Sequence, residues 1–313
     1  MPRKTASLED QLARLAELRS EPSSPEARSE VARFLNARSS LLTAKAARIA
    51  GEWQATELIP ELLSAFERFL VKPETTDKGC AAKVAILKAL CKLEHSSPSV
   101  FLRGIRHIQM EPEWGRLVDT AAEVRGLSAI GLAQTAYPEA LEEILPLLLD
   151  AERSARIGGV RAIAACGLPG DTLILRLKAL SGDREPEVMG ECFAALLRVE
   201  PVKSLAFVAA FLDGEQEAVA EAAALALGDA RLEGAFDVLR IAFERPHTRA
   251  LRRTLLLAMA LLRREPAIDF LLDLVQTGDG QTSAYALAAL AMYDQDAKLR
   301  ERLESARASR DVL

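Results

Sequence analysis

Apolar residues recur along this chain with the spacing of amphipathic helices. In the stretch 57–70, Leu58, Leu62, Phe66 and Leu70 lie four positions apart. A spacing of three or four residues puts side chains on one face of an α-helix. The segments 138–150, 201–212, 233–243 and 265–275 repeat this design. We find no alternating runs of β-branched residues bounded by turns, so the sequence predicts helices and no strands.

Each of these helices is followed by an Ala-rich one, and the pairs recur at regular distances. The Ala-rich helices close at Gly51, Cys91, Gly131, Ala164, Ala195, Gly228, Met259 and Ala291, at intervals of 40, 40, 33, 31, 33, 31 and 32 residues. One pair cannot bury both of its apolar faces, whereas stacked pairs share a continuous core. We therefore expect an all-α fold, an α-solenoid (superhelix) of about eight antiparallel helix pairs.

One repeat carries a recognisable polar pattern. The segment 145–150 (Leu-Pro-Leu-Leu-Leu-Asp) is followed by Arg156, and the segment 59–63 repeats the proline element. With a first-helix proline, a turn aspartate and a second-helix arginine, the chain resembles the HEAT-repeat family, including its bacterial form, the phycobilisome-lyase HEAT-like repeat. The pattern departs from the family after Asp213, where Ala220 stands in the place of the arginine. The resemblance covers residues 28–295 and implies a fold more specifically than a function.

The repeats leave a short segment at each end of the chain. We expect a single repeat domain over 1–313, with an N-terminal capping helix and loop over 1–27 and repeats over 28–295. A second, charged capping helix is expected over 296–313. Terminal elements with a polar outer face are what an array of stacked pairs requires.

Composition narrows the range of partners and compartments. The formal charge of −5 and the pI of about 5.5 make a nucleic-acid partner unlikely, because such proteins need a basic face. The sequence has no signal-peptide pattern and no apolar run long enough for a membrane helix. We expect a cytoplasmic protein without membrane contact, whose four cysteines are reduced core thiols.

The repeat becomes irregular between residues 77 and 125. The first two intervals are longer than the others, and in the second the excess falls around 109–116. Insertions in repeat arrays map to loops on one face, often the binding face. The candidate partner-binding residues are Lys83, His107, Glu111, Trp114, Asp119 and Arg125. A structural role is the alternative, in which Trp114 fills the gap left by the longer loop while His107 and Asp119 cap helix ends.

Arginines cluster in a second segment, 245–264. Arg249, Arg252 and Arg253 could form a strip that grips an anion or an acidic peptide, since guanidinium groups suit such ligands. The preceding repeat is acidic, so ion pairing between neighbouring repeats is the alternative.

The sequence contains no recognisable catalytic or metal-binding motif. There is no Gly-x-Ser-x-Gly elbow and no glycine-rich phosphate loop. Cys80, Cys91, His95 and His107 are potential ligands, but no two of them form the close pair that structural zinc uses. We expect no catalytic residues, no metal and no cofactor.

These observations predict a non-enzymatic scaffold that binds a protein or peptide of unknown identity along the surface of the repeats. An accessory protein or lyase of the bilin-lyase type is an alternative that the family resemblance implies. A nucleic-acid-binding helical-repeat protein is a third. The sequence contains no feature that names the partner.

Overall fold

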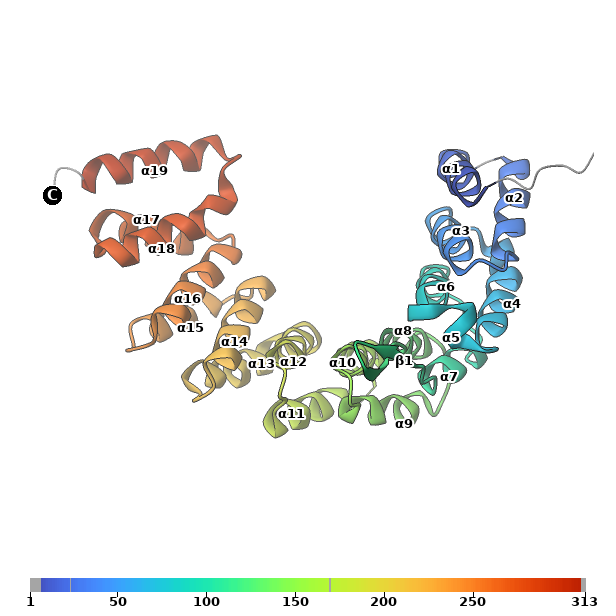
Figure 1. The fold of residues 1–313 in the computed structure, drawn as a ribbon. Helices are drawn as coiled ribbons and strands as arrows, with labels where there is room; N and C mark the ends of the chain where they lie inside the picture. Colours follow the sequence, from blue (N-terminus) through green and yellow to red (C-terminus); the bar gives the residue numbers. More distant parts are fainter. Residues whose placement is uncertain (1–6, 23, 169, 311–313) are drawn as a thin grey trace, which may run out of the picture. The chain divides into compact units, whose positions relative to one another are not determined.

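Helices make up almost all of the structure, a computed structural model that describes residues 7–22, 24–168 and 170–310 (Figure 1). The chain divides into two compact units, 1–167 and 168–313. Each unit is built from antiparallel helix pairs, so the predicted all-α repeat fold is confirmed. The expected limits of the caps and of the repeat region stay predictions.

The first unit holds four helix pairs after a leading helix. Its α-helices are α1 (Leu8–Leu18), α2 (Pro25–Leu35), α3 (Ser40–Glu52), α4 (Ile59–Phe69), α5 (Pro73–Thr76), α6 (Ala81–Lys92), α7 (Ser99–Ile105), α8 (Ala122–Ala133), α9 (Ala140–Ile144) and α10 (Arg153–Cys166). Short 3-10 helices add η1 (Thr56–Leu58), η2 (Lys78–Cys80) and η3 (Leu145–Leu149). The second helices α3, α6, α8 and α10 pack against one another in sequence, and α2, α4, α7 and α9 run along their other side (Figure 1).

The second unit repeats the arrangement and ends on a final helix. Its α-helices are α11 (Asp171–Ser181), α12 (Pro186–Val199), α13 (Pro201–Ala209), α14 (Glu217–Ala230), α15 (Ala235–Phe243), α16 (Arg249–Leu261), α17 (Glu265–Thr277), α18 (Gly280–Leu290) and α19 (Ala297–Arg310). Two 3-10 helices, η4 (Ala210–Asp213) and η5 (Ala291–Tyr293), extend α13 and α18. Helices α12, α14, α16 and α18 pack in order, and α19 lies against α17.

Several helices begin where the sequence provides a cap. The side chains of Ser24, Ser39, Thr248 and Asp279 each accept a hydrogen bond from a backbone N–H of the first turn. Such a cap satisfies one of the amide donors that a helix start leaves without a partner. The helix boundaries therefore follow from local sequence in these repeats.

Small residues let successive second helices approach closely. A Cβ added at Gly158 of α10 would lie 2.2 Å from the Cα of Gly126 in α8, and one at Gly228 of α14 would lie 2.4 Å from the carbonyl oxygen of Ala258 in α16. No real side chain tolerates such distances, so these backbones meet without side chains between them. The Ala- and Gly-rich second helices thus set the spacing of neighbouring pairs.

Two predictions about secondary structure were wrong. The helix expected over 138–150 ends at Ile144 and continues as the 3-10 helix η3, because Pro146 has no N–H for the α-helical ladder. The segment expected to hold no strand forms an antiparallel hairpin, β1 (Met110–Glu113) with β2 (Arg116–Asp119), in which Glu113 pairs with Arg116. Trp114 and Gly115 join the strands with positive φ angles of 47° and 80°, as in the two-residue turns favoured by hairpins.

Among the described residues we find no helix whose length and hydropathy would let it cross a bilayer. The expected cytoplasmic location stays a prediction.

The contact between α8 and α10 gives a direct test of the packing. We expect Gly158→Ala to lower the free energy of unfolding by about 1–3 kcal/mol, because the new methyl group must displace the backbone of Gly126. Urea denaturation followed by circular dichroism measures the loss. Gly280→Ala is the control, since a Cβ there meets nothing within 4 Å. A Gly158→Ala protein as stable as the control would contradict the close approach.

Candidate functional site

A buried polar network fastens the β-hairpin to the first unit, and Gln109 stands at its centre. The Gln109 side chain is fully buried. Its Nε2 donates to the backbone oxygen of Asp77 at 3.0 Å and to the carboxylate of Glu111. Its Oε1 accepts from the Sγ of Cys80 at 3.3 Å and lies 3.2 Å from the Nε2 of His107. One amide side chain thus connects the turn before α6 with the start of the hairpin.

Glu111 holds the first strand against that turn. Its two carboxylate oxygens accept from the backbone N–H of Gly79, at 2.9 and 3.2 Å. Gly79 has a φ of 69°, a left-handed conformation that glycine adopts without strain. Burial raises the pKa of Glu111, but the hydrogen bonds from Gly79 and Gln109 outweigh it and bring the pKa below its ordinary value. The strand is therefore anchored by an ionised carboxylate.

Arg125 of α8 ties the end of the hairpin to the next helix pair. One guanidinium nitrogen donates to the Oδ2 of Asp119 at 2.6 Å and to the backbone oxygen of His107 at 3.0 Å. The other two reach both carboxylate oxygens of Asp150, at 2.8 and 2.9 Å. Asp119 also accepts from the backbone N–H groups of Gln109 and Ala121, at 3.1 and 2.9 Å. Strand β2, α8 and the turn before α10 meet at this guanidinium.

Lys83 forms a separate buried ion pair behind the network. Its Nζ lies 3.0 Å from the Oδ2 of Asp77, and both side chains are fully buried. The same Asp77 carboxylate accepts from the N–H groups of Ala82 and Lys83, and so caps the start of α6. Lys83 also donates to the backbone oxygen of Phe69 at 3.3 Å. Its charge is thus fully engaged inside the fold.

The structure brings five of the six predicted site residues to one region and separates the sixth. Four of them, His107, Glu111, Asp119 and Arg125, belong to the network around Gln109, and Lys83 lies behind it. Trp114 projects from the tip of the hairpin and is 95% exposed. The suggestion that Trp114 fills a gap was wrong, because the residue has almost no neighbours. Asp119 accepts from the backbone N–H of Ala121, the residue that precedes α8, and that helix has no side-chain cap bond.

Sequence reasoning missed the two residues that organise the network. Gln109 was not a candidate, because nothing in its neighbours shows that its amide is buried. Asp150 was assigned to a pattern with Arg156, whereas its carboxylate binds Arg125 and its backbone oxygen accepts from Arg156 at 2.9 Å. A contact between residues 25 positions apart in a repeat of irregular length leaves no local signal.

The side chains of this network and the thiols of Cys80, Cys91 and Cys192 are poor candidates for catalysis or metal binding. Burial lowers the pKa of His107, and its ring nitrogen is already hydrogen-bonded to Gln109. Burial raises the pKa of Cys80 and Cys91 to about 11 and that of Cys192 to about 12, so these thiols are protonated at neutral pH. Within the described residues no group of three or more potential ligands could hold a metal ion. The polar groups act on one another and position the hairpin.

An apolar patch covers the outer side of the hairpin. We call Ile108, Met110, Trp114 and Leu117 the hairpin patch; their side chains are 64%, 44%, 95% and 67% exposed. Side chains alternate between the two faces of a strand. Burial of Glu111 fixes its face toward the helices, and consequently Met110 and Leu117 point away from them. The exposed apolar surface is thus a result of the hairpin's register.

The three arginines of the predicted strip lie on α16 and differ in their exposure. Arg252 is half-buried on α16, where its guanidinium lies 4.2 Å from the centre of the Phe243 ring and donates to the Phe243 backbone oxygen at 3.1 Å. Arg249 and Arg253 are exposed on the same helix. Arg252 therefore also packs against Phe243, and the anion-binding strip of Arg249, Arg252 and Arg253 stays a prediction.

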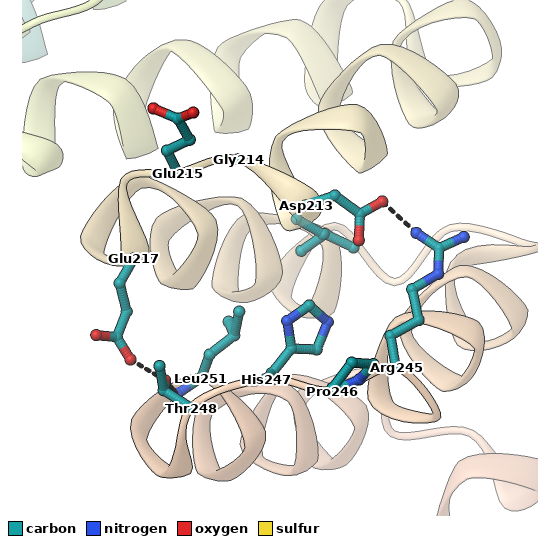
Figure 2. A pocket seen from close by; sticks show the side chains of 10 residues that line it. Asp213, Gly214, Glu215, Glu217, Arg245, Pro246, His247, Thr248 and Leu251 are labelled. Carbon is teal, nitrogen blue, oxygen red and sulfur yellow. Dashed lines mark hydrogen bonds and ion pairs between the residues drawn. The ribbon is translucent and has the colours of Figure 1, made fainter.

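A pocket of about 730 Å³ opens in the second unit between the loops that precede α14 and α16. Figure 2 shows His247 pointing into the space between two contacts, Asp213 with Arg245 and Glu217 with Thr248. Thr248 also caps α16, which holds this loop in place. No feature of the sequence pointed to this pocket, since its residues come from two different repeats.

Comparison with known proteins gives likenesses to solved structures alone. No family model matches the sequence, and no curated protein matches it. A solved structure of human deoxyhypusine hydroxylase in complex with glycerol is 16% identical, over 93% of this chain and 92% of that one, with a TM-score of 0.30. An engineered protein is 16% identical, over 97% of this chain and 90% of that one, with a TM-score of 0.36.

The first of these comparisons corrects the functional prediction made from the sequence. Deoxyhypusine hydroxylase is an enzyme, and the prediction of a non-enzymatic scaffold, made from the lack of catalytic motifs, was wrong. At this identity and TM-score the likeness transfers neither the activity nor the site of that protein.

Acidification tests the role of the Asp119 carboxylate. Burial raises its pKa, but hydrogen bonds from Ala121, Gln109 and Arg125 outweigh burial and lower the pKa. The stabilisation is therefore present above the unfolded value of about 3.9 and is lost as the pH falls through the lower folded value. We expect Asp119→Asn to cost about 1–3 kcal/mol of unfolding free energy at neutral pH and to reduce the loss on acidification.

Urea denaturation at a series of pH values measures both effects. Glu113→Gln is the matched control, since this carboxylate lies exposed on the same hairpin. Asp119→Asn would be expected to flatten the acid limb of the stability curve relative to that control. Identical curves for the two variants would show that Asp119 carries no such stabilisation.

Proposed function

We propose that the chain binds a partner protein through the hairpin patch, with Trp114 as the anchor. The partner is a protein with an apolar pocket that accepts an indole ring. The proposal concerns binding and is independent of whether either protein is an enzyme. It includes the assignment of the repeats to the HEAT type, which rests on Pro146 in a first helix and Asp150 at the following turn.

The conformation of Trp114 supports the proposal most directly. Its φ of 47° lies in the left-handed region, which is unfavourable for a bulky side chain and common for Asn or Gly. The residue is 95% exposed, so packing within the chain does not repay this strain. Strained positions of this kind cluster at functional sites. A contact with another molecule gives the indole the burial that the chain itself does not provide.

The surroundings of Trp114 suit a recognition element. Large aromatic side chains dominate the energetics of protein interfaces when they enter a desolvated pocket. The network of Gln109, Glu111 and Arg125 fixes the strands behind the tip, so little conformational freedom remains to be lost on binding. Met110 and Leu117 expose further apolar surface on the strands of the same hairpin. A fixed hairpin with an aromatic tip therefore favours specific binding.

Photo-crosslinking from the tip of the hairpin identifies the partner. With benzoylphenylalanine in place of Trp114, we expect one protein of defined mass to be crosslinked in cells that contain the chain. The control carries the same group in place of Val202, which is 89% exposed in the second unit. The same products from both positions, or crosslinks to lipid alone, would contradict a protein partner at the hairpin.

Two variants of Trp114 then separate binding from folding. Asn-Gly is the favoured sequence for a turn with two positive φ angles, so Trp114→Asn should keep or raise the stability of the hairpin. It should nevertheless weaken binding of the purified partner about 30-fold, as expected for loss of an anchor worth about 2 kcal/mol. Trp114→Phe should lose less affinity. Calorimetry measures binding, and an unchanged affinity for Trp114→Asn would rule out the anchor.

A further inference from the structure

The pocket in the second unit has an apolar floor and a polar rim. Leu212, Pro246 and Leu251 line it together with the carboxylates of Asp213 and Glu217. The carboxylates stand on one repeat and their partners, Arg245 and Thr248, on the next (Figure 2). A ligand that fits must bury an apolar stem and present polar hydrogens to the rim.

The charges of the lining favour a cation. Asp213 neutralises Arg245, while Glu217 has no cationic partner among the lining residues; the Glu215 side chain points away from the pocket (Figure 2). Helix starts attract anions, and both α14 and α16 begin beside the pocket. Glu217 in the first turn of α14 and the Thr248 cap of α16 already meet that preference. The exposed Arg249 does not belong to the lining. The remaining charge at the rim is negative.

His247 adds a ring nitrogen that no described residue hydrogen-bonds. Its Nε2 is shielded from solvent and has no hydrogen-bond partner among the described residues. In the tautomer protonated on Nδ1, this nitrogen is an acceptor. An unmet buried acceptor costs free energy, and an N–H donor brought by a ligand removes the cost. The imidazole therefore favours the same kind of ligand as the carboxylates.

We propose that this pocket binds an alkylammonium group, carried by a lysine side chain or by a free aliphatic polyamine. The alkyl stem lies on Leu212, Pro246 and Leu251, and the ammonium group donates to Glu217. The site belongs to the second unit and the hairpin patch to the first, so this inference does not depend on the proposed function. If the experiments disprove one of the two proposals, the other still stands.

Nuclear magnetic resonance locates binding without a known ligand. The chain has three histidines, and the imidazole signal of His247 is assigned by its loss in His247→Phe. Titration of the full chain with tetralysine or with spermidine should shift that signal saturably and leave those of His95 and His107 in place. Tighter binding of tetralysine indicates a peptide source, and tighter binding of spermidine a free amine. Glutarate, an anion with a similar stem, should have no effect.

Variants of the rim complete the test. Glu217→Gln keeps an acceptor for Thr248 but removes the charge, and should weaken binding of the better probe about tenfold in calorimetry. Glu233→Gln, at an exposed position in the same unit, is the matched control and should bind like the parent. Shifts that never saturate, an equal response to glutarate, or equal affinities of the two variants would each overturn the proposal.

Discussion

The arrangement of the first unit depends on the close approach of its successive second helices, α3, α6, α8 and α10. Gly126 and Gly158 let α8 and α10 meet backbone to backbone. That contact brings the turn before α10 beside α8, so the carboxylate of Asp150 comes within 2.8 Å of Arg125, the residue next to Gly126. Arg125 in turn holds Asp119 at the end of the hairpin. The position of the hairpin thus depends on two glycines that belong to the helical core.

The sequence predicts the regular part of the fold well and the irregular part poorly. Spacing of apolar residues indicates the helix pairs, because each pair repeats the same burial pattern along the chain. The hairpin strands have four residues each, too few for alternation to be distinguished from a loop. A Trp-Gly pair is also a weak signal for a turn that Asn-Gly normally forms. The structure brings five of the six candidate residues to one region, but their burial depends on contacts between repeats that no local pattern reveals.

The buried network and the exposed patch have different physical roles. Replacement of a buried ion pair by apolar residues of similar volume often costs little stability, so stability alone gives weak reason to bury Arg125 with two aspartates. Hydrogen bonds, in contrast to apolar contacts, fix direction and register. The bond from Gly79 to Glu111 determines which face of β1 lies toward the helices, and the bond from Arg125 to Asp119, on the other face, holds the end of β2. Specification of the outward face is the role that the geometry supports for these polar residues.

Local preference and observed conformation disagree at Trp114, and this disagreement is informative. In most of the chain, caps, helix formers and small residues favour the conformations that they adopt, as expected for sequences that fold cooperatively. At the hairpin tip, a residue with a large apolar side chain occupies a backbone conformation that a small polar residue would fill at lower energy. The indole neither packs nor hydrogen-bonds within the chain in a way that offsets the unfavourable backbone conformation of Trp114, since the side chain is almost fully exposed. The proposed binding surface therefore rests on the exposed indole rather than on the polar groups that support it.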